Sequence, residues 1–86
     1  MIDEKKVCRM CGSYNNLEVH HCIHGTANRK LADEDGLTVY LCHTCHMKLH
    51  DTRAYDLAYI QMAQHYYETH IGSRAKFRER YGKSWL

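Results

Sequence analysis

The sequence contains no proline, a single phenylalanine, a single tryptophan and no long apolar run. A membrane-spanning helix needs about 20 consecutive apolar residues, so we expect no association with a membrane. Low-complexity stretches are absent too, which predicts one domain over residues 1–86 without a linker. No apolar signal segment follows the polar residues 1–6, so we expect a soluble, cytoplasmic protein.

A domain of 86 residues buries a small apolar core and usually needs a further cross-link. Five cysteines and eight histidines offer two kinds of cross-link, disulfides and metal ions. In a reducing cytoplasm, paired cysteines are more often zinc ligands than disulfides. We therefore expect a metal-stabilised domain.

Two Cys-x-x-Cys pairs, Cys8 with Cys11 and Cys42 with Cys45, are separated by 30 residues. Each pair supplies two thiolates from one turn, and a hairpin between the pairs would complete the tetrahedral site that zinc prefers. Four sulfur ligands leave no open position, so this zinc is predicted to be structural; a redox dithiol is the alternative. Cys22 is left over, and we expect it to be a small buried residue on a strand.

Residues 17–22 and 37–41 have the alternation and the side chains typical of short strands. The polar residues 25–36 between them are predicted to form a loop, too long for a tight hairpin turn. No breaker follows Cys45, which is therefore expected at or near the start of a helix.

A further helix is predicted over about residues 53–69, with Asp51 or Thr52 as its N-cap. After Gly72 and Ser73 we expect a short basic helix that ends at Gly82. The longer helix carries a stripe at helical spacing that is predicted to pack in the core, made of Tyr55, Ala58, Tyr59, Met62, Ala63 and Tyr66.

Adjacent histidines, His20 and His21, lie at the end of the first predicted strand and point in different directions. His46 and His50 are one helical turn apart. If His20 joins them around a divalent cation, open positions remain for phosphate and water, and the unligated imidazole of His21 can accept a proton. The alternative is that these histidines bind a second structural zinc.

Residues 17–25 (LEVHHCIHG) and 41–50 (LCHTCHMKLH) together resemble the HNH (His-Me finger) endonuclease motif, and more closely small zinc-containing HNH-like proteins of bacteriophages and prophages. The resemblance covers about residues 8–50. It implies an α+β fold: a small zinc-bound, treble-clef-like ββα-metal finger, extended here by C-terminal helices over residues 53–86. It also implies that His21 is the general base and that His20, His46 and His50 bind one catalytic divalent ion, Mg²⁺, Mn²⁺, Ni²⁺ or Zn²⁺.

The sequence departs from that family at Leu37, where the family usually has an asparagine that helps to orient the base. Asn28, Asp35 or a backbone carbonyl are the candidates to orient His21 instead. The implied activity is hydrolysis of DNA to 5′-phosphate and 3′-hydroxyl ends, in phage or prophage DNA processing within a bacterial host cell.

The charge is uneven along the chain, because residues 73–86 carry five basic residues and one acidic residue. Such a segment suits an anionic partner, and nucleic acid is the commonest for a soluble protein. The expected DNA contacts are Arg29, Lys30, Arg74, Arg78 and Arg80. Two other functions stay open: a non-catalytic zinc module that binds DNA, and a module whose tyrosine-rich helix docks on phage packaging or recombination proteins.

Overall fold

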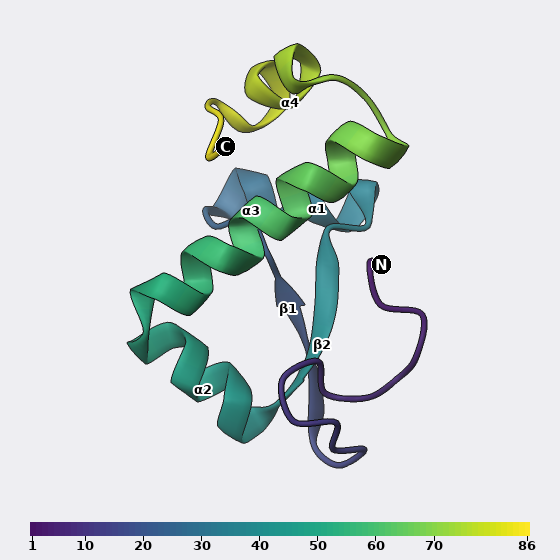
Figure 1. The fold of residues 1–86 in the computed structure, drawn as a ribbon, viewed down its shortest axis with the longest axis vertical. Helices are drawn as coiled ribbons and strands as arrows, with labels where there is room; N and C mark the ends of the chain where they lie inside the picture. Colours follow the sequence, from purple (N-terminus) through teal and green to yellow (C-terminus); the bar gives the residue numbers. More distant parts are fainter.

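The computed structural model describes all 86 residues and has an α+β fold, as the sequence predicts. A two-stranded antiparallel sheet is accompanied by four helices (Figure 1). In chain order these elements are β1 (Leu17–His21), α1 (Thr26–Asp35), β2 (Thr38–Cys42), α2 (His43–Asp51), α3 (Arg53–His70) and α4 (Arg74–Tyr81). None of the helices combines the length and the apolar character that crossing a bilayer requires.

The two strands form the centre of the molecule. Their register pairs Leu17 with Cys42 at one end and His21 with Thr38 at the other. Most of β2 is buried, whereas β1 buries only His20. Cys22 follows β1 directly and is fully buried, which confirms its expected burial. The hairpin thus carries Cys42 at one end and the histidine pair, His20 and His21, at the other.

The segment between the strands is a helix, so the prediction of a polar loop over residues 25–36 was wrong. Glycines in the positive-φ region flank this helix, Gly25 at φ 101° and Gly36 at φ 70°. Ala32 is its one buried residue, with Leu31 half-buried beside it. A helix that buries so narrow a face shows almost no apolar periodicity, and the sequence pattern missed it for that reason.

Helix α2 begins directly after β2, so Cys45 lies in its first turn, as expected. Thr52, in an extended conformation, separates α2 from α3 and stands at the N-cap position without a side-chain hydrogen bond. The buried face of α3 differs from the predicted stripe: Tyr55 and Ala58 are exposed. The residues that α3 buries are Ile60, Ala63, Gln64 and Tyr67. The predicted Tyr59, Met62 and Tyr66 pack at the edge of the core.

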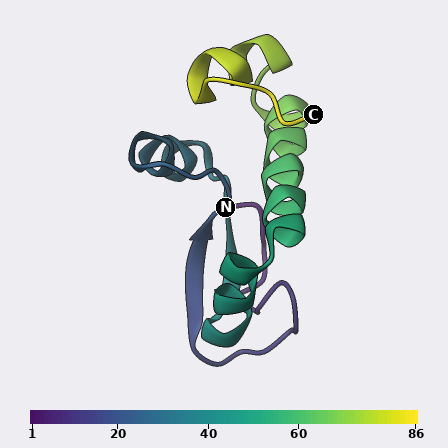
Figure 2. The same cartoon turned by 90° about the vertical axis from the view of Figure 1, so that its left-hand side faces the viewer.

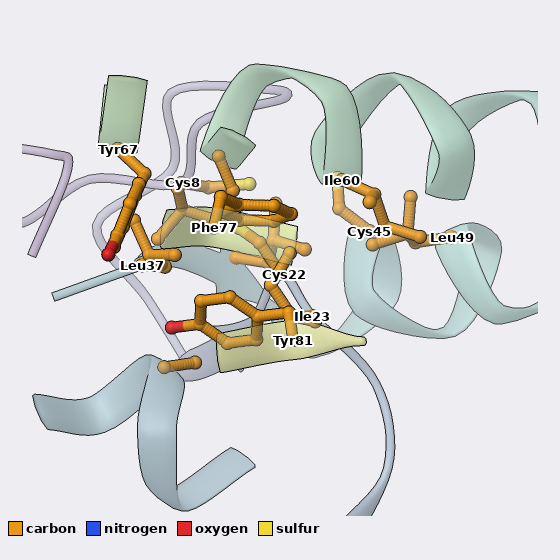
Figure 3. Close-up of a cluster of buried hydrophobic side chains, with 14 of the residues drawn as sticks. Cys8, Cys22, Ile23, Leu37, Cys45, Leu49, Ile60, Tyr67, Phe77 and Tyr81 are labelled. Atoms are coloured by element: carbon orange, nitrogen blue, oxygen red, sulfur yellow. The ribbon is translucent and has the colours of Figure 1, made fainter. Parts of the chain in front are cut away.

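Helix α4 closes the core at one end of the molecule. Ser73 caps it by accepting a hydrogen bond from the Lys76 amide, and Gly82 ends it in the left-handed region, as predicted. Phe77 lies among aromatic rings, 5.3 Å from Tyr67 and 4.7 Å from Tyr81 between centroids. Figure 3 shows these side chains meeting Leu37 and Cys22 of the central hairpin region. The basic segment is therefore packed through its aromatic residues.

Helix α2 contacts both strands of the hairpin, and α1 contacts β1. In the view of Figure 2, α1 and α3 lie to the left and to the right, with α4 above both. Helix α4 contacts α1 as well as α3. Helix α2 lies at the opposite end of α3 from α4 (Figure 1).

Candidate functional site

The four paired cysteines come together as the sequence predicts. The Sγ atoms of Cys8, Cys11, Cys42 and Cys45 all lie within 4.8 Å of one another. Cys11 Sγ and Cys42 Sγ are 3.7 Å apart. Around tetrahedral zinc with Zn–S bonds of about 2.3 Å, two sulfurs are separated by about 3.8 Å. This cysteine cluster could therefore hold a metal ion such as zinc.

The electrostatics of the cysteine cluster also favour a cation. Burial raises the pKa of Cys8, but backbone N–H groups of Cys42, Cys11 and Met10 outweigh it and lower the value to about 6. Burial and then the neighbouring thiols raise the pKa of Cys45 to about 12. Closely spaced thiolates repel one another, so the full set ionises only when a cation compensates the charge.

A second group of candidate ligands surrounds a pocket of about 300 Å³ on the other side of α2 from the cysteines. It is lined mainly by imidazoles and one guanidinium, and we call it the histidine pocket. Its residues are Val19, His20, His21, His24, Arg29, His46 and His50. The predicted ligands and the predicted base therefore share one cavity, together with Arg29.

Of the three predicted ligands, His20 and His46 are close enough to bind one ion, whereas the three imidazoles together do not converge as the four cysteines do. His20 Nδ1 and His46 Nε2 are 3.2 Å apart, and the rings of His46 and His50 stack with centroids 4.9 Å apart. Nitrogen ligands at about 2.05 Å from a tetrahedral metal would be about 3.3 Å apart. The observed spacing thus fits two ligands of the same ion.

His20 is held in a form that can ligate a metal. It is only 2% exposed, and burial, followed by repulsion from His46 and His24, lowers its pKa to about 4. At neutral pH the ring is therefore neutral and keeps a lone pair. Its Nε2 atom is buried without any hydrogen-bond partner. Unsatisfied buried polar atoms are rare in proteins and call for a functional explanation.

Glu18 was missed by the sequence analysis and controls the orientation of His46. A carboxylate only accepts hydrogen bonds, so His46 Nδ1 donates to Glu18 Oε1 over 2.7 Å. His43 Nδ1 lies 2.9 Å from the other carboxylate oxygen. Hydrogen bonds from both imidazoles lower the pKa of Glu18. The donation leaves the Nε2 lone pair of His46 facing His20, the arrangement typical of metal-binding histidines. Glu18 and His20 share one strand face, a clue the sequence did contain.

His21 pairs with Asp33, which is none of the predicted candidates. His21 Nε2 donates to Asp33 Oδ1 over 2.7 Å. Asn28 instead donates from Nδ2 to the carbonyl of His24, and Asp35 accepts from Arg80 and Tyr81. Both side-chain predictions for the orienting residue were therefore wrong, because the loop assumed to carry them is helix α1.

His24 is the other pocket residue that the sequence analysis left without a role. Its Nε2 donates to Asp56 in the first turn of α3, and its ring lies 6.0 Å from that of His20. The C-terminal extension thus reaches the wall of the histidine pocket through this hydrogen bond and through Tyr59, whose ring lies 6.0 Å from that of His20.

The predicted DNA-binding residues fall into two sets. Arg29 lines the histidine pocket, and Lys30 and Arg78 are exposed without ion pairs. Arg74 instead donates to Glu68. Arg80 donates to Asp35 and Glu34, and these partners raise its pKa. Part of the positive charge of the C-terminal segment is thus used in contacts within the protein.

Comparisons with known proteins add no relative: no protein-family model matches the chain, and no curated protein or solved structure is similar to it.

Proposed function

We propose that the protein is a metal-dependent endonuclease of the HNH type, with the histidine pocket as its active site. One observation carries the proposal: five imidazoles and a guanidinium line a single cavity, and three of these imidazoles, that of His21 among them, are each paired with a carboxylate. Divalent-ion ligands, a proton acceptor and a phosphate-binding cation are what phosphodiester hydrolysis needs. The hairpin with α2 then corresponds to a ββα-metal, treble-clef-like finger.

Two metal sites with different roles follow from this proposal. Cys8, Cys11, Cys42 and Cys45 would hold a structural zinc. His20, His46 and His50 would hold the catalytic ion, Mg²⁺, Mn²⁺, Ni²⁺ or Zn²⁺, because three neutral imidazoles suit all of these with different affinities. When bound, that ion would neutralise charge on the scissile phosphate and on the leaving oxygen.

The protein groups supply the remaining chemistry. With Nε2 of His21 donating to Asp33, the lone pair of the ring is on Nδ1, which accepts the proton of the attacking water. The water oxygen then forms a bond to phosphorus while the bond to the 3′ oxygen breaks, which leaves 5′-phosphate and 3′-hydroxyl ends. Arg29, at the rim of the pocket, binds the non-bridging oxygens of the phosphate.

DNA is the partner, bound through its backbone and so with weak sequence preference. Arg29, Lys30 and Arg78 are the cations available for such contacts, since Arg74 and Arg80 have internal partners. This activity suits processing of phage or prophage DNA in the cytoplasm of a bacterial host cell, beside packaging or recombination proteins.

Cleavage of supercoiled plasmid in the presence of Mg²⁺, Mn²⁺ or Ni²⁺ tests the proposal. Removing the general base in His21→Ala should slow cleavage by about 10²- to 10⁴-fold. His65→Ala is the matched control, because His65 is exposed on α3 away from the pocket. Equal rates for the wild type and His21→Ala would exclude His21 as the base.

Metal content separates the endonuclease from a zinc module that only binds DNA. The wild type should retain one zinc after dialysis and bind a second, exchangeable ion that His20→Ala no longer binds. A single ion in total, together with DNA binding and no cleavage by the wild type, would favour the non-catalytic module.

A further inference from the structure

We propose that Asp33 is the positioning residue of His21, a role for which the sequence offers no motif; this inference rests on the proposed function. His21 Nε2 donates to Asp33 Oδ1 over 2.7 Å, and His21 lines the histidine pocket. Leu37, at the position of the missing asparagine, is fully buried in the core. A helix inserted between the strands thus supplies the contact that the hairpin itself does not.

Helix α1 delivers Asp33 to this position because its last turn is fixed on two sides. Ala32 packs into the core at 0% exposure. The next two acidic residues face α4: Glu34 accepts from Arg80 Nη2 over 2.8 Å, and Asp35 accepts from Arg80 Nε and from the Tyr81 hydroxyl. Three consecutive carboxylates therefore have two different tasks: Glu34 and Asp35 hold α1 against α4, and Asp33 holds His21.

The chemistry of the pair explains why a carboxylate suits this task. Asp33 only accepts hydrogen bonds, so it selects the ring tautomer with hydrogen on Nε2 and leaves the lone pair on Nδ1. It also limits rotation of the ring, whose position decides whether a water in the pocket can be deprotonated. Without this contact the two tautomers interconvert and only one has its lone pair on Nδ1.

The pair contributes little to folding, which makes it testable. The side chain of Asp33 is 64% exposed and that of His21 18% exposed. Exposed pairs of this kind barely change protein stability. Substitution of Asp33 should therefore leave the fold intact, and any change at His21 reports on positioning alone.

The experiment reads the tautomer of His21 directly, from the ring nitrogen chemical shifts of the full, zinc-loaded chain with the imidazole neutral. The wild type should show hydrogen on Nε2. Asp33→Ala should show a mixture of tautomers, whereas Asp33→Asn, whose amide oxygen still accepts, should keep the wild-type form. Glu4→Ala removes an exposed carboxylate that does not line the histidine pocket and is the matched control.

Plasmid cleavage by the same variants completes the test. Asp33→Ala should lower kcat by about 10- to 100-fold with little change in KM, and Asp33→Asn should recover most of that loss. An unchanged tautomer and kcat in Asp33→Ala would overturn the inference while wild-type cleavage upholds the proposed function. A tautomer that shifts in Asp33→Ala, with no cleavage by the wild type, would uphold the contact and overturn the endonuclease.

Discussion

The cysteine cluster and the histidine pocket are built from the same hairpin and the same helix, yet they differ in access. Cys45 and His46 are neighbours in α2, and the first is buried while the second lines a cavity. Four thiols surround one point in the cluster, which leaves a metal no open position. The pocket instead has imidazoles along its wall and open space in front of them.

Under the proposed function, this difference separates a structural metal site from a catalytic one within one small domain. Adjacent helix residues point about 100° apart, so a single turn of α2 contributes side chains both to the cysteine cluster and to the histidine pocket. Under the proposed function, the sulfur ligands would stabilise the fold and the nitrogen ligands would stay accessible to substrate. The cysteine cluster and the histidine pocket can each be disrupted by separate substitutions.

The largest effect should follow loss of the cysteine cluster. Cys45→Ser removes one thiolate, and a structural zinc contributes about 10–16 kcal/mol of binding free energy, comparable to or larger than the stability of a typical domain. We expect the cooperative thermal transition in circular dichroism to disappear and the zinc content to fall. Cys22→Ala is the control and should keep both zinc and the transition. A cooperative, zinc-loaded Cys45→Ser would show that the cluster is not the structural site.

The next effect concerns the histidine pocket alone. Glu18→Ala frees the ring of His46, and loss of such a supporting carboxylate weakens metal binding by about 10- to 100-fold. Calorimetric titration of the exchangeable ion measures this affinity. His43→Ala should leave it unchanged, because His43 shares the same carboxylate but does not line the pocket. Equal affinities in wild type and Glu18→Ala would exclude the supporting role.

A smaller effect is expected from the contact between α1 and α4, with the cysteine cluster left intact. Tyr81→Phe removes the hydrogen bond to Asp35 and should lower the free energy of unfolding by about 1 kcal/mol without changing the zinc content. Urea unfolding measures this loss.

The same variant carries a pH dependence with a definite sign. Burial, and then the hydrogen bond to Asp35, raise the pKa of Tyr81 above its ordinary value of about 10. The unfolded state therefore loses its proton first, and the stabilisation is present below about pH 10 and declines as the pH rises above it. The difference in the free energy of unfolding between wild type and Tyr81→Phe should therefore narrow as the pH rises above about 10. A constant difference would contradict the raised pKa.

The smallest effects are expected from the exposed cations. Arg29→Ala and Arg78→Ala should each reduce the slope of log affinity for DNA against log salt by about 1, because each removes one phosphate contact. Lys48→Ala is the control, since Lys48 lies beside the cysteine cluster. A slope that falls only for Arg29→Ala would limit the DNA interface to the pocket and leave α4 outside it.

Local features of the sequence predicted much of the fold. The two Cys-x-x-Cys pairs, the strands around His20 and Leu41, and the end of the last helix at Gly82 depend on neighbouring residues, so local pattern alone identified them. Four of the five pocket histidines were likewise found from the adjacent pair and the one-turn spacing in α2, and His24 was missed. The sequence did not predict helix α1 because this helix buries a single alanine. It predicted the buried face of α3 only in part, because Tyr59 and Tyr66 lie at the edge of the core.

The partners of the functional side chains were decided by tertiary structure. His21 meets Asp33 only because residues 26–35 form a helix, and Arg80 meets Asp35 across 45 positions of chain. Glu18 reaches His46 because the hairpin lies against α2. The sequence by itself determined which side chains could bind metal and accept a proton, since that depends on their chemistry. Which carboxylate holds each imidazole depends on packing between distant segments, and spacing along the chain records little of it beyond the strand face that Glu18 shares with His20.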